Sequence, residues 1–249
     1  MLEGLKEAME YIKDLGVRAE KPQVLEICGK TYADKNLVQY GKQPKAAPVQ
    51  ARTLSAMMDY IENCSQEFNG RMIIHIYSPS EVKLISELDG DRERECLFQS
   101  HAEISGFQFD EWYDQERFMI ELQANFEENE DRKTVMKLAG NIEKKNEQTF
   151  SDDGTTQLAT MQVGVATKAD VIVPNPVELI PYRTFREVEQ PASRFVLRIG
   201  ERRGEPVFKI VEAEGGLWKN AATESIKQYF YDRLTSIPED ISGKILVIG

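Results

Sequence analysis

The side chains best suited to hold a ligand lie in one segment of the second half of the chain. Tyr182-Arg183-Thr184-Phe185-Arg186 alternates aromatic rings with guanidinium groups, and further arginines follow closely. A ring can stack on a base, and a guanidinium can pair with a phosphate. The segment therefore predicts a site for a nucleotide or for single-stranded nucleic acid, unless the arginines pair across the strands with nearby glutamates. The candidate ligand-binding residues are Tyr182, Arg183, Arg186 and Arg198.

Motifs for catalysis are missing from the sequence. The two histidines, His75 and His101, each fall within an alternating strand pattern, and no Gly-x-Ser-x-Gly motif accompanies either. The chain also lacks the Gly-x-x-x-x-Gly-Lys-Ser/Thr loop and the Gly-x-Gly-x-x-Gly turn that hold nucleotide phosphates. We therefore expect a protein that is not an enzyme and that needs no cofactor.

Metal-binding patterns are missing as well. Cys28, Cys64 and Cys96 are widely spaced, and together with the histidines they match no zinc spacing. The segment from Asp89 to Glu95 carries several carboxylates, but its glycine stands second instead of sixth and its flanks have strand patterns. We expect a solvated hairpin there and no metal site.

Composition limits the class of partner. The chain has 249 residues, 41% of them hydrophobic, so it can bury a sizeable core. Its 42 acidic residues against 31 basic ones give a net charge of −11, which disfavours broad binding to duplex DNA. Such a surface suits solubility, a basic partner or mimicry of nucleic acid. No stretch approaches the roughly 18 apolar residues of a membrane helix, so we expect a cytoplasmic protein without a membrane partner.

The first segment predicts an amphipathic helix that ends at Gly16. Its apolar side chains recur at steps of three and four residues: Leu2, Leu5, Met9, Ile12 and Leu15. This apolar face must be covered. Packing on its own domain is favoured, and docking on another subunit is the alternative.

The rest of the first half predicts an antiparallel meander. Residues 24–28 and 37–40 are typical of a hairpin, and a helix capped by Thr53 runs to Cys64. Short turns then separate three strands, at 72–77, 82–88 and 96–102. Asp114 caps a further helix, and another helix carries Val135 and Leu138. The acidic segment 127–131 suggests a boundary between lobes 1–128 and 129–249, with a single domain as the alternative.

The second half is mostly β. Its strands are expected at 156–165, 171–173, 177–182, 195–199 and 207–211, with a closing helix from Trp218 and a last edge strand at 245–248. The strands at 177–182 and 195–199 are apolar on nearly both faces, which predicts that both are central. The fold class is therefore α+β, with an N-terminal helix plus antiparallel meander lobe and a C-terminal β-rich lobe closed by a helix.

Several segments also carry a family resemblance: 52–64, 112–126, 146–150, 176–185 and 189–191. Together they resemble the YfdQ-like family of uncharacterised phage and prophage proteins, in the version found in phages of Gram-positive bacteria. The likeness covers most of the chain, but no motif in it has an assigned role. It implies a phage origin, often near genes for DNA recombination and replication, and a place in the cytoplasm of a bacterial host.

Three functional hypotheses follow. The first is a non-catalytic phage accessory protein that acts by binding, as a homo-oligomer. The second is a nucleotide or single-stranded nucleic-acid binder, centred on Tyr182, Arg183 and Arg186, that serves phage DNA metabolism or counter-defence. The third is an acidic decoy of a DNA-binding host protein.

Overall fold

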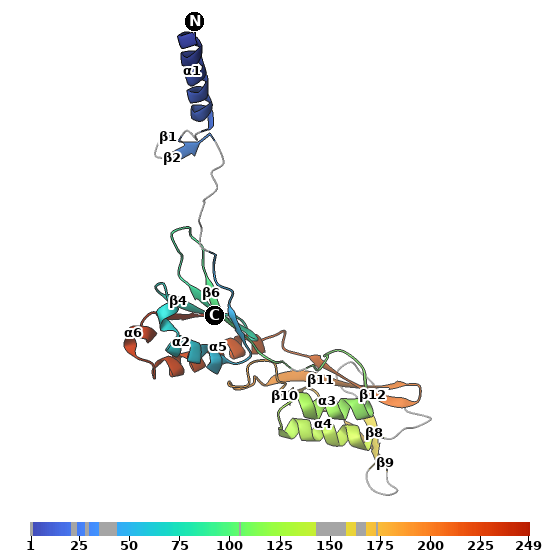
Figure 1. Ribbon diagram of the computed structural model, residues 1–249. Coiled ribbons are helices and arrows are strands. Elements are labelled where there is room, and N and C mark those ends of the chain that lie inside the picture. Colours follow the sequence, from blue (N-terminus) through green and yellow to red (C-terminus); the bar gives the residue numbers. More distant parts are fainter. Residues whose placement is uncertain are drawn as a thin grey trace. The chain divides into compact units, whose positions relative to one another are not determined.

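The computed structural model describes the residues 2–20, 24–27, 30–34, 44–104, 106–142, 158–162, 168–172 and 174–249. The chain divides into two compact units, Met1–Lys45 and Ala46–Gly249 (Figure 1). Each unit is described by itself below.

The smaller unit consists of one helix and a hairpin. Helix α1 (Leu2–Glu20) continues through Gly16, so the predicted end at that glycine is wrong. A single glycine inside a helix costs about 1 kcal/mol relative to alanine, too little to stop it. Strand β1 (Val24–Ile27) pairs with β2 (Lys30–Ala33), which lies where the sequence predicted the turn of the hairpin. The second strand predicted at 37–40 lies outside the described residues.

The larger unit contains a five-stranded sheet in the order β13-β4-β5-β6-β3. Its strands are β3 (Val49–Ala51), β4 (Met72–Ser78), β5 (Glu81–Ser86), β6 (Cys96–His101) and β13 (Ile245–Ile248). The predicted antiparallel meander β4-β5-β6 is confirmed. Strands β13 and β3 join it in parallel at its two edges, so the sheet is mixed.

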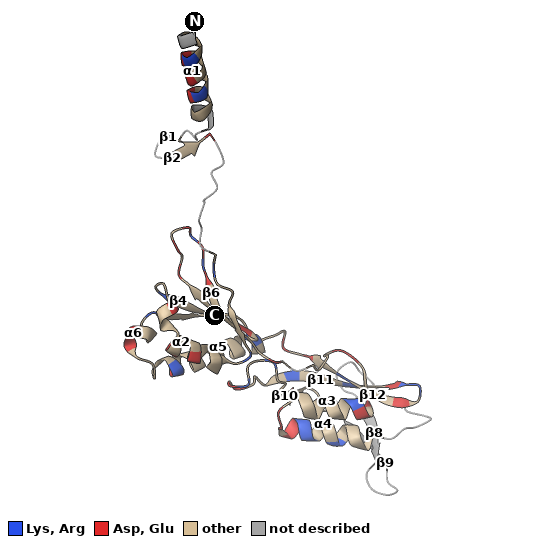
Figure 2. Cartoon of the chain, viewed as in Figure 1, with Lys and Arg blue, Asp and Glu red and all other residues tan. Residues whose placement is uncertain are grey.

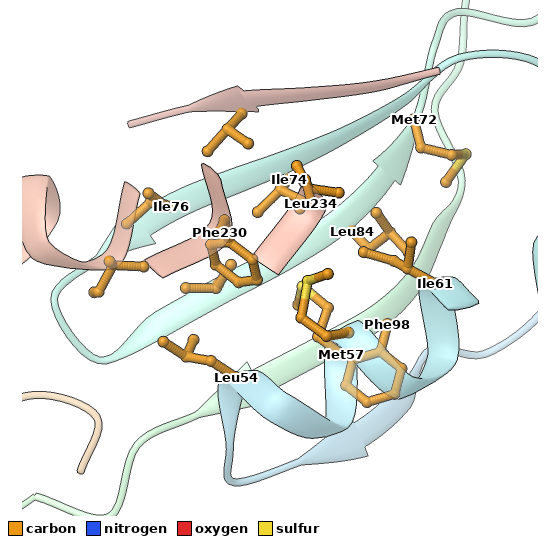
Figure 3. Close-up of a cluster of buried hydrophobic side chains, with 14 of the residues drawn as sticks. Leu54, Met57, Ile61, Met72, Ile74, Ile76, Leu84, Phe98, Phe230 and Leu234 are labelled. Carbon is orange, nitrogen blue, oxygen red and sulfur yellow. The ribbon is translucent and has the colours of Figure 1, made fainter. Parts of the chain in front are cut away.

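Two helices bury the apolar side of this sheet (Figure 3). They are α2 (Leu54–Asn63) and α5 (Trp218–Leu234). The cluster includes Met57 of α2, Ile74 of β4 and Phe230 of α5, each fully buried. Thr53 caps α2 as predicted, since its hydroxyl accepts a hydrogen bond from the Ala56 N–H. Short helices η1 (Ser65–Glu67) and α6 (Glu239–Ser242) complete this part.

A second sheet has four strands in the order β10-β11-β12-β7. They are β7 (Tyr113–Asp114), β10 (Val177–Leu179), β11 (Ser193–Arg202) and β12 (Glu205–Glu212). Strand β11 is central as predicted, but β10 is an edge strand, so the prediction that both are central is wrong for β10. Proline cannot donate to a ladder, and Pro181 makes only an isolated bridge to Phe126. The apolar side chains of β10 are buried because helices cover the sheet.

Those helices are α3 (Gln115–Asn125) and α4 (Glu130–Asn141), which lie side by side against one face of the sheet (Figure 1). Phe118 of α3 and Val135 of α4 share one fully buried cluster with Phe208 of β12. Asp114 caps α3 as predicted. The boundary proposed between 128 and 129 falls between these two helices.

Strands β8 (Leu158–Gln162) and β9 (Lys168–Ile172) form a separate antiparallel hairpin. They overlap the strands predicted at 156–165 and 171–173. The remaining residues of those two predicted strands lie outside the residues that the structure describes. Helix α5 begins at Trp218, where the closing helix was predicted. It packs on β4 and β13 of the five-stranded sheet, however, and its large buried side chains belong to the core of that sheet instead of the core of the C-terminal strands. The α+β fold class is therefore confirmed.

Candidate functional site

The connection from β10 to β11, residues 180–192, folds around one buried amide, and we call it the Gln190 loop. Gln190 is 4% exposed. Its Oε1 accepts hydrogen bonds from the backbone N–H groups of Arg183 (3.0 Å) and Thr184 (3.2 Å). Its Nε2 donates to the carbonyl oxygens of Phe185 (2.8 Å) and Val188 (3.3 Å). One side chain thus satisfies four backbone groups and fixes the path of the loop.

Further hydrogen bonds attach the Gln190 loop to three other elements. The Thr184 hydroxyl donates to the carbonyl of Pro79 in the β4–β5 turn (2.5 Å). The Glu187 carboxylate accepts from the first two N–H groups of α2, at 2.9 and 2.7 Å. The Tyr182 N–H donates to the carbonyl of Asn125 at the end of α3 (3.0 Å). The loop is therefore held rigidly between the two sheets of the larger unit.

Arg183 is the buried cation of this loop. Only 8% of the residue is exposed. Its Nη2 donates to the Ser193 hydroxyl (2.5 Å), and its Nη1 lies 3.9 Å from a carboxylate oxygen of Glu212. The guanidinium carbon lies 4.1 Å from the centre of the Trp218 ring, which is a close cation–π contact. Its buried Nε has no hydrogen-bond partner among the described residues.

Burial costs this guanidinium part of its solvation. It lowers the pKa of Arg183 to about 10, although the negative charges of Glu212 and Glu214 act in the opposite direction. Arg183 therefore stays protonated at neutral pH. A buried cation with one unpaired N–H and a long ion pair, 3.9 Å to Glu212, is incompletely neutralised. It therefore favours an anionic group placed beside it.

Arg183 lines a pocket of about 510 Å³. This volume lies within the usual range for small-molecule sites, about 300–1,000 Å³. The lining comes from four parts of the chain: Ser78, Pro79 and Ser80; Ile104, Phe107, Gln108 and Phe109; Tyr182 and Arg183; and Trp218 and Lys219. Aromatic rings, hydroxyl groups and two cations therefore surround one space.

Packing behind the pocket holds its aromatic residues in place. The Phe109 ring stacks on Phe195, with centroids 5.3 Å apart and planes 8° from parallel. The Phe107 ring stacks on Tyr113 at 5.0 Å. The Tyr113 hydroxyl in turn accepts a hydrogen bond from the backbone N–H of Gln108 (2.8 Å). Since these rings are fixed before any ligand arrives, binding would require little reordering of the site.

The structure brings two of the four predicted site residues together in this pocket, Tyr182 and Arg183. Arg186 is exposed and is not part of the lining, but its guanidinium stacks 3.5 Å from the centre of the Tyr182 ring. Arg198 is not brought to the pocket. Successive residues of a strand point to opposite faces, which places Arg198 on the other face of β11 from Ser193.

Sequence reasoning missed the partners of Arg183 that come from distant segments. Trp218 and Lys219 begin α5, and only the N-cap residue Leu217 separates them from the glycine pair Gly215-Gly216, whose φ angles of 61° and 84° are left-handed. This combination, an aromatic residue and a lysine at the start of a helix that follows two glycines, could have indicated a ligand site from the sequence. The phenylalanines at 107 and 109 offered none, because short loops rich in aromatic residues commonly serve packing alone.

His75 and Cys96, which the sequence offers as reactive side chains, are not part of the lining of this pocket. The half-buried His75 ring makes an edge contact with Tyr77, at 6.0 Å between centroids. Burial raises the pKa of the Cys96 thiol, which lowers its reactivity at neutral pH. In the ranges that the structure describes, no three His, Cys, Asp or Glu side chains are grouped to hold a metal ion. No helix in those ranges has the length and apolar character needed to span a membrane.

Comparison with protein-family models, with curated proteins and with solved structures finds no match to this chain. The resemblance to the YfdQ-like family therefore stays a prediction. The pocket at Arg183 is the feature from which a function must be argued.

Proposed function

We propose that this chain is a non-catalytic binding protein whose Arg183 pocket takes a nucleotide, that is, a ligand with a flat aromatic ring and an anionic group. The observation that carries the proposal is the state of Arg183. Its guanidinium is buried and stacks on Trp218, and its Nε has no hydrogen-bond partner among the described residues. The same side chain lines a pocket rich in aromatic side chains. A phosphate would neutralise this cation, and a base would stack on the rings.

Overall charge favours a small ligand over a nucleic-acid strand. A strand follows a basic groove over several phosphates, whereas this chain carries a net charge of −11. The pocket supplies two cations, Arg183 and Lys219, enough for one or two phosphate groups. We therefore place a mononucleotide or dinucleotide ahead of single-stranded DNA or RNA.

In the phage setting implied by the family resemblance, such a protein would hold a nucleotide in the host cytoplasm. It would serve phage DNA metabolism, or it would remove a signalling nucleotide on which a host defence depends. Neither role requires a catalytic group.

Isothermal titration calorimetry on the full chain tests the proposal. The probes are AMP, ATP, cyclic di-AMP and cyclic GMP–AMP, and a short oligothymidine represents single strands. We expect at least one nucleotide to bind with a micromolar or lower dissociation constant, and oligothymidine to bind far more weakly. Absence of binding heat for every nucleotide would refute the proposal. A protein partner would then be the next hypothesis to test, including a host DNA-binding protein that the acidic surface occupies as a decoy.

A pair of arginine variants locates the site. Arg183→Met keeps the apolar stem of the side chain and removes its charge, and we expect it to weaken binding at least 30-fold. Arg194→Met is the matched control, because Arg194 is exposed and lies on the opposite face of β11 from Ser193. It should change affinity less than twofold. Equal losses in the two variants would contradict a pocket at Arg183.

A second variant guards against misfolding of the first. Lys219 is exposed and lines the same pocket, so Lys219→Gln should leave the fold intact. It should still reduce nucleotide affinity about 5- to 10-fold. An unchanged affinity in Lys219→Gln, together with an unfolded Arg183→Met, would show that Arg183 serves the fold and not a ligand.

A further inference from the structure

Helix α1 exposes a row of apolar side chains within its own unit. Leu5, Met9 and Ile12 are 59%, 65% and 67% exposed. The described parts of this unit besides α1 are mainly the hairpin β1–β2, whose Val24 and Ile27 are also more than half exposed. A unit of this size, with no disulfide or metal among its described residues, has too little core to be stable alone.

The spacing of this row is that of a coiled-coil seam. Steps of four and three residues lead from Leu5 to Met9 and Ile12, which take the d, a and d positions of a heptad, and Gly16, which has no side chain, follows at the next a position. Most of the stability of a helix in a protein comes from packing of its amphipathic face, so a partner along this seam would also stabilise the 19-residue helix itself. The seam predicts another helix with the same repeat as its partner.

The flanks of the seam select a parallel partner. Lys6 and Lys13 occupy the e positions on one flank, whereas the g positions on the other flank hold the uncharged Ala8 and Leu15. In a parallel pair each e residue faces a g residue of the partner, so the Lys13 stem would cover Ala8. In an antiparallel pair e residues face each other, which would bring Lys6 close to Lys13 of the other helix. The acidic residues Glu7, Glu10 and Asp14 lie away from the seam, and Figure 2 shows both signs of charge along α1.

We propose that α1 of this protein pairs in parallel and in register with α1 of a second copy, so that this helix forms the interface of a homodimer. The paired length is little more than two heptads, which is short for a coiled coil. The dimer should therefore dissociate in the micromolar range, and its α1 helix content should rise with protein concentration.

Sedimentation equilibrium of the full chain, from about 1 to 200 µM, measures this association. We expect a mass that approaches twice the chain mass of 28.4 kDa. Ile12→Lys places a charge in the seam and should give a monomer throughout this range. Tyr11→Lys is the matched control: the same substitution one residue earlier, at a c position outside the seam, should leave the dimer intact.

Cross-linking tests the direction of the helices. In a parallel, in-register pair the two copies of residue 9 face each other, so Met9→Cys should form a covalent dimer on mild oxidation. Tyr11→Cys should form none above the background of the wild-type chain, which has three cysteines of its own. A wild-type monomer at 200 µM, a dimer that survives Ile12→Lys, a trimer, or equal cross-linking at positions 9 and 11 would each overturn the proposal.

Discussion

Replacing Gln190 by methionine should destabilise the larger unit and weaken the pocket at the same time. Methionine is similar to glutamine in length and size, but it has no hydrogen-bond donor and its thioether sulfur is only a weak acceptor. The change therefore leaves a side chain of similar shape in place while it removes four hydrogen bonds from the Gln190 loop.

The size of the effect follows from which groups lose their partner. The N–H groups of Arg183 and Thr184 bond to Gln190 in buried surroundings. The carbonyl of Phe185 keeps a second partner, the N–H of Val188 at 3.4 Å. The bond to the Val188 carbonyl is partly exposed, so water can replace it. A buried polar group left unpaired costs about 1–3 kcal/mol. Two such groups at about 1.5 kcal/mol each, in the lower half of this range because the loop can relax, give about 3 kcal/mol.

Urea unfolding followed by tryptophan fluorescence measures this loss. With an m value of about 3 kcal/mol/M, the midpoint should fall by about 1 M urea. The control is Glu189→Gln, an exposed neighbour whose substitution should change the free energy of unfolding by less than about 0.5 kcal/mol. Since Gln190 also positions the backbone of Arg183, nucleotide affinity should fall in Gln190→Met. A midpoint within 0.2 M of the wild type would refute the view that this amide organises the loop.

Two further predictions concern the sheets. Arg203 and Gly204 form the two-residue turn between β11 and β12, with φ angles of 57° and 81°. Arg203→Asn supplies the Asn-Gly pair that this turn prefers, so it should raise the free energy of unfolding by about 0.5–1 kcal/mol. A thermal midpoint below that of the wild type would contradict this turn geometry. A hydrogen bond from Lys83 (2.8 Å) lowers the pKa of the Glu81 carboxyl in the folded protein. The stabilisation by this ion pair is therefore present above the pKa that Glu81 has in the unfolded chain, and it is lost as the pH falls through the lower pKa of the folded protein. The stability advantage of the wild type over Glu81→Gln should therefore shrink between about pH 5 and pH 3, and an advantage that did not change with pH would show that this ion pair contributes nothing.

Local patterns were enough to predict the elements that bury one regular face. The caps Thr53 and Asp114 lie where the sequence predicted them, because a capping side chain acts on its own helix within three residues. The β4-β5-β6 meander could also be predicted, since alternation and short turns are local properties. Both kinds of signal depend only on neighbours in the sequence.

Pairings between distant segments could not be predicted in this way. Strand β7 joins β12, and β13 joins β4, although the two strands of each pair are far apart in the sequence. The central position assigned to β10 failed for a related reason. Its apolar character reflects coverage by helices as well as position in the sheet, and a single strand cannot tell the two apart.

The candidate site combines a local and a distant contribution. Tyr182 and Arg183 were found because aromatic and cationic residues alternate within one short segment. Trp218, which stacks on Arg183, comes from the start of α5, and only tertiary structure shows that they meet. Arg198 was included because it is near in sequence, yet strand alternation turns it to the other face of β11.

Burial of Arg183 connects the stability of the fold with its proposed ligand. The Gln190 loop holds this cation in a position where solvation is lost and neutralisation is incomplete, so the free protein bears an electrostatic cost. A bound phosphate would remove part of that cost only in the folded state, because the unfolded chain has no such pocket. A ligand present at 100 times its dissociation constant would then stabilise the protein by about 2.7 kcal/mol. Much of this stabilisation should disappear in Arg183→Met, since the variant has no buried charge for the phosphate to neutralise.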